Sequence, residues 1–353
     1  AKRISNEDFQ ELEQGDCRPQ KGDVLISKDG TIGKVAVVDN NDFVVLSSLG
    51  ILRPSDNISS QFLKYFAESK YSVEQMKSHL KGSAITRITL EIINDLDFIL
   101  PPRNEQEKIV SFLDQEVEGI DKLINKKQKL INLLEEKRTA LIKSAVSNGL
   151  TADIGRKDSG VEWIGEIPEH WEVRDLRYLA DIDTGDKDTK DAVDSGEYPF
   201  FVRSQTEERI NSYSYDGEAI LTAGDGVGVG KVFHYIDGKF DYHQRVYKIS
   251  DISDEIHGEL LYYYLRANLK MEIFKNNAKS TVDSLRMPMF KSFPIAFGDI
   301  KEQQAIVDYL DSQNKEIDNL IKKVELGVER LKEYRTALIT NAVTGQIDVR
   351  GEV

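Results

Sequence analysis

Two ten-residue stretches that lie far apart in the chain are nearly identical: EQEKIVSFLD at residues 105–114 and EQQAIVDYLD at residues 302–311. They are 197 positions apart, and the same offset relates later segments, because RTALI occurs unchanged at residues 138–142 and 335–339. A single offset that holds from residue 105 to residue 146 indicates a duplicated structural unit.

The duplicated segments have the apolar spacing of long helices. In the first copy, apolar residues recur three, four or seven positions apart, at 109, 113, 117, 120, 124, 131, 134 and 141, and no proline interrupts either copy. We expect helices at residues 105–148 and 302–345, each longer than one small domain can cover. The other copy is the natural partner, so we expect an antiparallel coiled coil with a pseudo-twofold axis. Two separate surface helices remain the alternative.

The repeat continues upstream in weaker form, through regions that differ more. GDVLIS at residues 22–27 resembles GEAILT at 217–222, and GKV recurs at 33–35 and 230–232. Short runs of β-formers around turn residues predict hairpins at 35–46 and 232–242. Helical patterns follow at 60–71 and 258–276. The sequence thus predicts an α+β protein with two mixed α/β halves, each followed by a long helix.

Composition narrows the class of protein. The chain has 353 residues, one cysteine and a net charge of −14, and no apolar run reaches the ~18 residues of a membrane helix. A single cysteine excludes an internal disulfide framework and favours the cytoplasm, where we place the protein. The negative charge argues against a protein that coats nucleic acid by bulk electrostatics. It permits local basic patches or a partner that supplies positive charge.

No catalytic, cofactor or metal motif is found. GDGVGVGK at residues 224–231 resembles a phosphate-binding loop, but Asp225 stands where that loop needs glycine, and Val232 where it needs Ser or Thr. A tight turn between strands is the better interpretation. The five histidines show no metal-ligand spacing. The triplet at 237–239 lacks the paired upstream Pro-Asp of nucleases.

Further sequence motifs resemble those of a known family. PPRNEQ at residues 101–106, the RTALI pair and GVEWIGEIPEHW at 160–171 are similar to specificity subunits of type I restriction-modification systems. The resemblance implies two target recognition domains that read the halves of a bipartite site in double-stranded DNA. It implies that the paired helices space these domains and dock two modification subunits. S-adenosylmethionine would bind those modification subunits, and ATP-driven cleavage would belong to restriction subunits; the resemblance implies no membrane.

The resemblance also predicts the domain boundaries. The first recognition domain is expected at residues 1–104, the first spacer at 105–148, the second domain at 149–301, the second spacer at 302–345 and a tail at 346–353. Because Ala1 aligns near residue 198 and no lead like residues 163–171 precedes it, we expect the first domain to lack its N-terminal part.

Candidate DNA contacts come from loops that match between the two halves. The recurring lysines, Lys34 and Lys231, are predicted to contact phosphates, whereas arginine and glutamine suit purine edges. The full predicted set is Lys28, Thr31, Lys34, Ser83, Arg87, Arg203, Gln205, Thr222, Lys231, Gln244, Arg245 and Lys279. Each of these loops could equally be an ordinary solvated loop.

Two other functions stay open. A coiled-coil scaffold that binds only proteins would share the helices without any selectivity for DNA. A free-standing enzyme would need catalytic residues, which the sequence does not reveal. The DNA sequence recognised and its spacer length cannot be derived from the chain.

Overall fold

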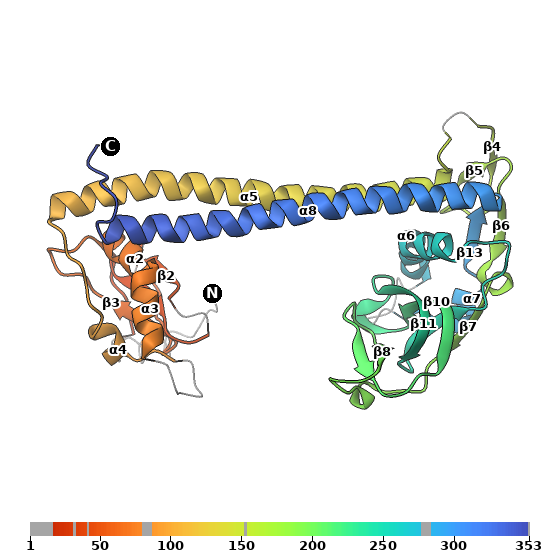
Figure 1. Cartoon of the computed structure of the whole chain (residues 1–353), viewed down its shortest axis with the longest axis horizontal. Coiled ribbons are helices and arrows are strands. Elements are labelled where there is room, and N and C mark those ends of the chain that lie inside the picture. The colour runs from red at the N-terminus through yellow and green to blue at the C-terminus, as the bar shows by residue number, and fades with distance from the viewer. Residues whose placement is uncertain are drawn as a thin grey trace. The chain divides into compact units, whose positions relative to one another are not determined.

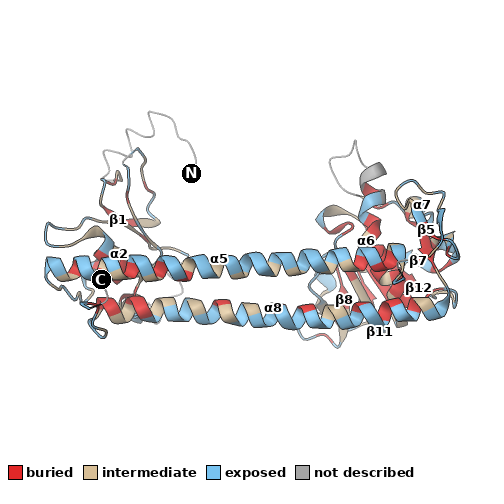
Figure 2. Cartoon of the chain, turned by 90° about the horizontal axis from the view of Figure 1, so that it is seen from above, coloured by how far each residue is buried: buried red, intermediate tan, exposed pale blue. Residues whose placement is uncertain are grey.

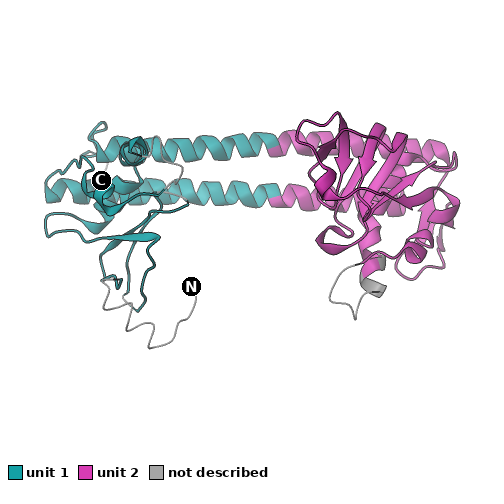
Figure 3. Cartoon of the chain, turned by 90° about the horizontal axis from the view of Figure 1, so that it is seen from below, with its two compact units in different colours: residues 1–131, 322–353 teal, residues 132–321 magenta. Residues whose placement is uncertain are grey.

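The computed structural model describes residues 17–30, 33–40, 42–79, 87–151, 154–276 and 284–351. The chain forms two compact units (Figure 3). Unit 1 contains residues 1–131 and 322–353, and unit 2 contains residues 132–321. The chain therefore leaves unit 1, builds unit 2 and returns to unit 1.

Two long helices dominate the structure and confirm the predicted helical repeat. Helix α5 spans Arg103–Asn148 and helix α8 spans Ile300–Val343 (Figure 1). Each unit holds part of both helices, and the two parts run antiparallel within it. In unit 1, Arg335 Nε lies 3.1 Å from Asp121 Oδ1, and in unit 2 Arg138 pairs with Asp318. The repeat relates the two pairs to each other: Arg138 corresponds to Arg335, and Asp121 corresponds to Asp318, each 197 positions further along the chain.

The buried faces of the helices are apolar, as the spacing predicted. In unit 1, Ile109 and Leu113 of α5 share a core with Ile339 and Val343 of α8. In unit 2, Val146 of α5 lies in one core with residues of the early part of α8. Away from these cores both helices are largely exposed or half-buried (Figure 2). The apolar faces of the helices are therefore buried mainly in the cores that they share with the two globular halves.

Unit 1 contains a small antiparallel sheet with strand order β2-β1-β3, against which α2 lies. Its elements are β1 (Val24–Ser27), β2 (Val35–Val37), β3 (Leu49–Leu52), α2 (Ser60–Glu68), α3 (Lys70–Ser78) and α4 (Leu90–Asn94).

Two predictions for unit 1 were wrong in detail. Residues 43–46 form no strand, and β2 pairs with β1 instead of forming a hairpin with the segment that follows it. The predicted helix at 60–71 breaks at Ser69, whose hydroxyl accepts a hydrogen bond from Ser72 N and so caps α3. Local propensity could not foresee either the tertiary pairing or the cap.

Unit 2 contains a larger sheet with strand order β7-β12-β10-β11-β8-β9 and two small two-stranded sheets, β4-β5 and β13-β6. Its elements are β4 (Arg156–Asp158), β5 (Glu166–Pro168), β6 (Glu172–Asp175), η1 (Leu176–Tyr178), β7 (Asp181–Thr184), η2 (Thr189–Asp191), β8 (Tyr198–Phe201), β9 (Glu208–Ile210), β10 (Tyr215–Ala223), η3 (Gly226–Gly228), β11 (Phe233–Tyr242), β12 (Val246–Ser250), α6 (Gly258–Asn276), α7 (Met287–Lys291) and β13 (Pro294–Phe297).

One hairpin prediction for unit 2 was also wrong. Asp237, Gly238 and Lys239 form no turn, and β11 continues through them in register with β10, where Gly217 faces Gly238. The helix predicted at 258–276 matches α6, and the turn predicted at 224–231 contains the short helix η3.

The two sheets have the same arrangement of strands at their centres. In unit 1, β1 lies between β2 and β3, and in unit 2 the matching strand β10 lies between β11 and β12. All four pairings are antiparallel. The weak upstream repeat in the sequence therefore corresponds to a repeated three-stranded core.

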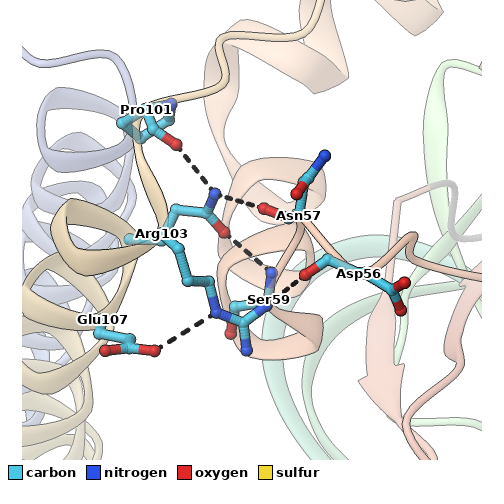
Figure 4. Close-up of polar contacts among 7 residues, drawn as sticks. Asp56, Asn57, Ser59, Pro101, Arg103 and Glu107 are labelled. Carbon is cyan, nitrogen blue, oxygen red and sulfur yellow. Dashed lines mark hydrogen bonds and ion pairs between the residues drawn. The ribbon is translucent and has the colours of Figure 1, made fainter.

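A buried glutamine fixes the first turn of each long helix to the globular half that precedes it in the chain. Gln106 lies in the first turn of α5, where its amide nitrogen donates to the carbonyls of Asn57 and Pro101, both at 2.9 Å, and its amide oxygen accepts from Ser59 N at 2.8 Å (Figure 4). In unit 2, Gln303 makes the same three contacts, with Glu255, Gly298 and His257. Both side chains are fully buried, so each amide satisfies backbone groups that water cannot reach.

Among the residues that the structure describes, no helix is long and apolar enough to cross a membrane.

Candidate nucleic-acid interface

In unit 2, three loops bring charged side chains together at one point. Arg203 follows β8, Asp225 follows β10, and Arg245 lies between β11 and β12. One carboxylate oxygen of Asp225 accepts from Arg203 Nη1 at 2.9 Å and the other accepts from Arg245 Nη1 at 3.0 Å. One aspartate thus holds two of the arginines that the sequence predicted as DNA contacts.

Glycines allow this turn to lie close to both arginine backbones. Gly224 N donates to the carbonyl of Arg245 at 2.9 Å, and a Cβ on Gly228 would lie 2.6 Å from the carbonyl oxygen of Arg203. Gly226 has φ +77°, a conformation that favours glycine. The glycine-rich sequence is therefore explained by close packing of loops, and the structure gives it no need of a phosphate ligand.

Val227 projects from the same turn and is 89% exposed. It borders a hollow of ≈ 320 Å³ that Arg203 and Asp225 also line. An exposed apolar side chain on such a loop is of the kind that can contact thymine methyl groups in the major groove.

Neighbouring polar side chains are also held in place. Gln244 Nε2 donates to Asp188 Oδ2 at 3.0 Å, and Gln205 Nε2 donates to the carbonyl of Phe233 at 3.2 Å. His243 is buried, and its Nδ1 accepts from Arg245 N at 2.9 Å. Burial lowers the pKa of His243, and the nearby Arg203 charge lowers it further. The ring is therefore neutral at pH 7 and can accept that hydrogen bond.

Thr222 must be removed from the predicted set. Its side chain is fully buried in β10, and its hydroxyl donates to the carbonyl of Val232 at 2.9 Å. The repeat aligns it with Ser27, but residues 219–223 of β10 are all buried, so its side chain lies in the core. Lys231, at the end of the same turn, is exposed.

Unit 1 repeats the arrangement in a simpler form. Arg87 Nε lies 3.2 Å from Asp29 Oδ1, and Arg87 Nη2 donates to the carbonyl of Ser47 at 3.3 Å. Asp29 follows β1 as Asp225 follows β10. Lys34 is exposed and Lys28 is half-buried. Thr31, Ser83 and Lys279 lie outside the described residues.

The backbone confirms that the two turns correspond. Asp29 forms an isolated antiparallel bridge with Arg87, and Asp225 forms one with Ser284. These arginines are in the set predicted from the sequence, whereas their partners Asp29 and Asp225 are not. The alignment of Asp29-Gly30 with Asp225-Gly226 was the signal that could have found them.

The described residues show no group of three or more His, Cys, Asp or Glu side chains that could hold a metal ion. What the two turns offer is guanidinium groups, amides and a few apolar atoms on exposed loops. Such groups bind and discriminate nucleic-acid surfaces.

Comparison with known families agrees with this geometry. Residues 2–133 and 168–330 match the family described as the type I restriction modification DNA specificity domain, and together the two matches cover more than half of the chain. The chain belongs to this family. Each match contains one recognition half and the beginning of the long helix that follows, so the specificity domain occurs twice.

Named relatives are specificity subunits of the same systems. The chain is 32% identical over 183 residues to the type I restriction enzyme EcoDI specificity subunit of Escherichia coli, an alignment that covers 52% of this chain and 40% of that subunit. It is 26% identical over 354 residues to the MjaVIII specificity subunit of Methanocaldococcus jannaschii, which covers 94% of this chain and 80% of that subunit.

A solved structure supports the fold. The chain superposes with a TM-score of 0.71 and 17% identity on a structure concerned with complex assembly and conformational transition of the type I R-M system, covering 92% of this chain and 82% of that one. Two specificity domains, each with a long helix, are thus the architecture of this chain.

Proposed function

We propose that this chain is the DNA specificity subunit of a type I restriction-modification complex. Each unit reads one half of a bipartite site in double-stranded DNA, and the paired helices hold the halves apart. The observation that carries the proposal is the repeated turn, where an aspartate holds exposed arginines in both units. Membership of the specificity-domain family supports the same function.

The scaffold alternative explains the turns less well. A coiled coil that binds only proteins has no need of arginines gathered at equivalent points of two different domains. The net charge of −14 fits a reader with local basic groups whose partners supply further positive charge.

Catalysis is assigned to partners. We propose that two modification subunits dock to the chain and carry S-adenosylmethionine, and that restriction subunits supply ATP-driven translocation and cleavage. This chain would then contribute recognition alone. The cytoplasm, where the host DNA lies, is the compartment that this function requires.

The test is reconstitution with the cognate modification subunits and S-adenosylmethionine, followed by sequencing of the methylated positions. We expect two short defined blocks separated by a constant number of unspecified bases, and no methylation, cleavage or ATP hydrolysis by the purified chain. Methylation without sequence preference, or turnover by the chain alone, would contradict the proposal.

Lys34 and Lys231 test the electrostatic part of the same function. Both are exposed beside the turns, and we propose that they contact phosphates. Replacing either by alanine should weaken binding of the complex to all sequences and flatten the dependence of log K on log salt by about one unit. Unchanged salt dependence would place these lysines away from the DNA.

A further inference from the structure

The Asp225 carboxylate has two partners that come from different loops. Arg203 and Arg245 each donate one hydrogen bond to it, at 2.9 and 3.0 Å. Because each oxygen serves one arginine, the carboxylate fixes the spacing of the two guanidinium groups as well as their positions.

Both guanidinium groups keep most of their donors available. The side chains of Arg203 and Arg245 are 42% and 57% exposed, and within the described residues each makes one ion pair, the one with Asp225. A guanidinium has five N–H donors, so each arginine can still present a fork of two to an acceptor pair.

The ion pairs are poorly placed to stabilise the fold. Exposed ion pairs contribute little to stability, and the turn is already joined to the Arg245 loop by the backbone hydrogen bond from Gly224 N. An aspartate also repels DNA phosphates. Its presence beside the predicted contacts needs a function that outweighs that repulsion.

Unit 1 shows which part of the arrangement is common to both. Asp29 occupies the place of Asp225 and holds Arg87, whereas the residue that matches Arg87 in unit 2 is Ser284. The aspartate therefore stays at one point of the turn while its arginines arrive from different segments. This is the pattern expected of a fixed support beneath side chains that read different sequences.

We propose that Asp225 is a positioning residue that orients Arg203 and Arg245 for bidentate contacts with guanine edges in the half-site read by unit 2. Asp29 does the same for Arg87 in the other half-site. An arginine on a free stem loses rotamer entropy when it contacts a base, and an existing ion pair removes part of that cost. The inference rests on the proposed function and names the base that each unit reads.

The experiment uses the complex of the full chain with its modification subunits. Asp225→Asn is compared with Asp194→Asn, which removes the same charge from an exposed position of the same unit. Binding is measured to the methylated-site duplex, to duplexes with single base-pair replacements and to unrelated DNA.

The two variants should separate positioning from charge. Asp225→Asn should reduce discrimination about 5- to 100-fold at one or two guanine-containing base pairs of one half-site, the range of a lost bidentate contact. Its binding to unrelated DNA should stay the same or become tighter. Asp194→Asn should leave discrimination unchanged, and Arg203→Ala should cost less selectivity when added to Asp225→Asn than when made alone.

The inference is overturned if the Asp225→Asn complex discriminates between base pairs as well as the unaltered complex does. This holds even if the variant complex binds all DNA more tightly. Asp29→Asn should change only the other half-site, and a change in both halves would also contradict it. If the unaltered complex binds every duplex alike, the proposed function itself fails, so the two failures are distinguishable.

Discussion

The two units have the same central strands and buried contacts and differ in the exposed side chains that these support. Both have a central strand between two antiparallel neighbours, a buried glutamine at the start of the long helix and an aspartate after the central strand. They differ in the arginines, because Asp29 holds Arg87 whereas Asp225 holds Arg203 and Arg245. Duplication has kept the structural contacts, and the exposed contacts have diverged.

The sheets explain part of this difference. The described residues place three strands in the sheet of unit 1 and six in that of unit 2. One of the additional strands, β8, ends immediately before Val202 and Arg203, and it pairs with β11 in parallel. Arg203 therefore reaches the turn on an element that has no counterpart among the described residues of unit 1.

The largest effect is expected when both long helices are lengthened and the loops predicted to contact DNA are left unchanged. The reciprocal pairs Asp121–Arg335 and Arg138–Asp318 set the helix register, so matched insertions are needed in both helices. Four residues added after Ile124 and four after Ile321 add ~6 Å at 1.5 Å per residue. Since a base pair rises ~3.4 Å, the gap between half-sites should grow by one or two base pairs.

Sequencing of the methylated sites checks this result. Methylation at the original spacing should disappear, while both half-site sequences stay the same. A four-residue insertion in α5 alone should be less active, because it separates the members of one reciprocal pair. Retention of the original gap, or recognition of new bases, would show that the helices are not the spacer.

The buried glutamines test whether both units are fixed in the same way. Gln106→Ala and Gln303→Ala each remove three hydrogen bonds to backbone groups that are shielded from water. Either substitution should lower the free energy of unfolding by about 2–4 kcal/mol, measured by denaturant titration. Gln304→Ala, on the exposed side of α8, is the control and should change it by under about 0.5 kcal/mol. Losses that differ widely between the units would show that the two glutamines do not have equivalent roles.

A smaller effect is expected on the pH dependence of stability, through His243 of unit 2. Burial holds the pKa of His243 below its ordinary value of 6.5, so the unfolded chain binds this proton more readily than the folded chain. The stability that depends on neutral His243 is fully present above pH 6.5 and is lost as the pH falls below it. Protonation also removes the acceptor for Arg245 N.

Thermal unfolding of unaltered protein and His243→Gln at pH 7.5 and 5.5 measures this contribution. The unaltered protein should lose more stability on acidification than the variant does. His79→Gln, at an exposed histidine of unit 1, should behave like the unaltered protein. The same acid sensitivity in His243→Gln would exclude His243 as the cause.

The wrong predictions at residues 237–239, Ser69 and Thr222 have a common origin, because each depends on contacts distant in the sequence or on a cap. At residues 237–239 an Asp-Gly pair favours a turn locally, but β10 pairs with residues 233–240 of β11 and the strand continues. At Ser69 a helix that looks continuous breaks, because the serine caps the next helix. Alignment with Ser27 made Thr222 a candidate for DNA contact, yet its side chain is fully buried at an end of β10 where every residue is buried.

By itself the sequence determined the duplication and the two long helices, because these depend on a constant offset and on local apolar spacing. Their antiparallel pairing was only expected from the sequence, and the tertiary contacts decided it. The sequence also located the turns after β1 and β10. Only the tertiary structure decided that Asp225 holds Arg203 and Arg245, which come from loops separated by twenty or more positions. No local period links such residues, so their meeting depends on the order of strands in the sheet.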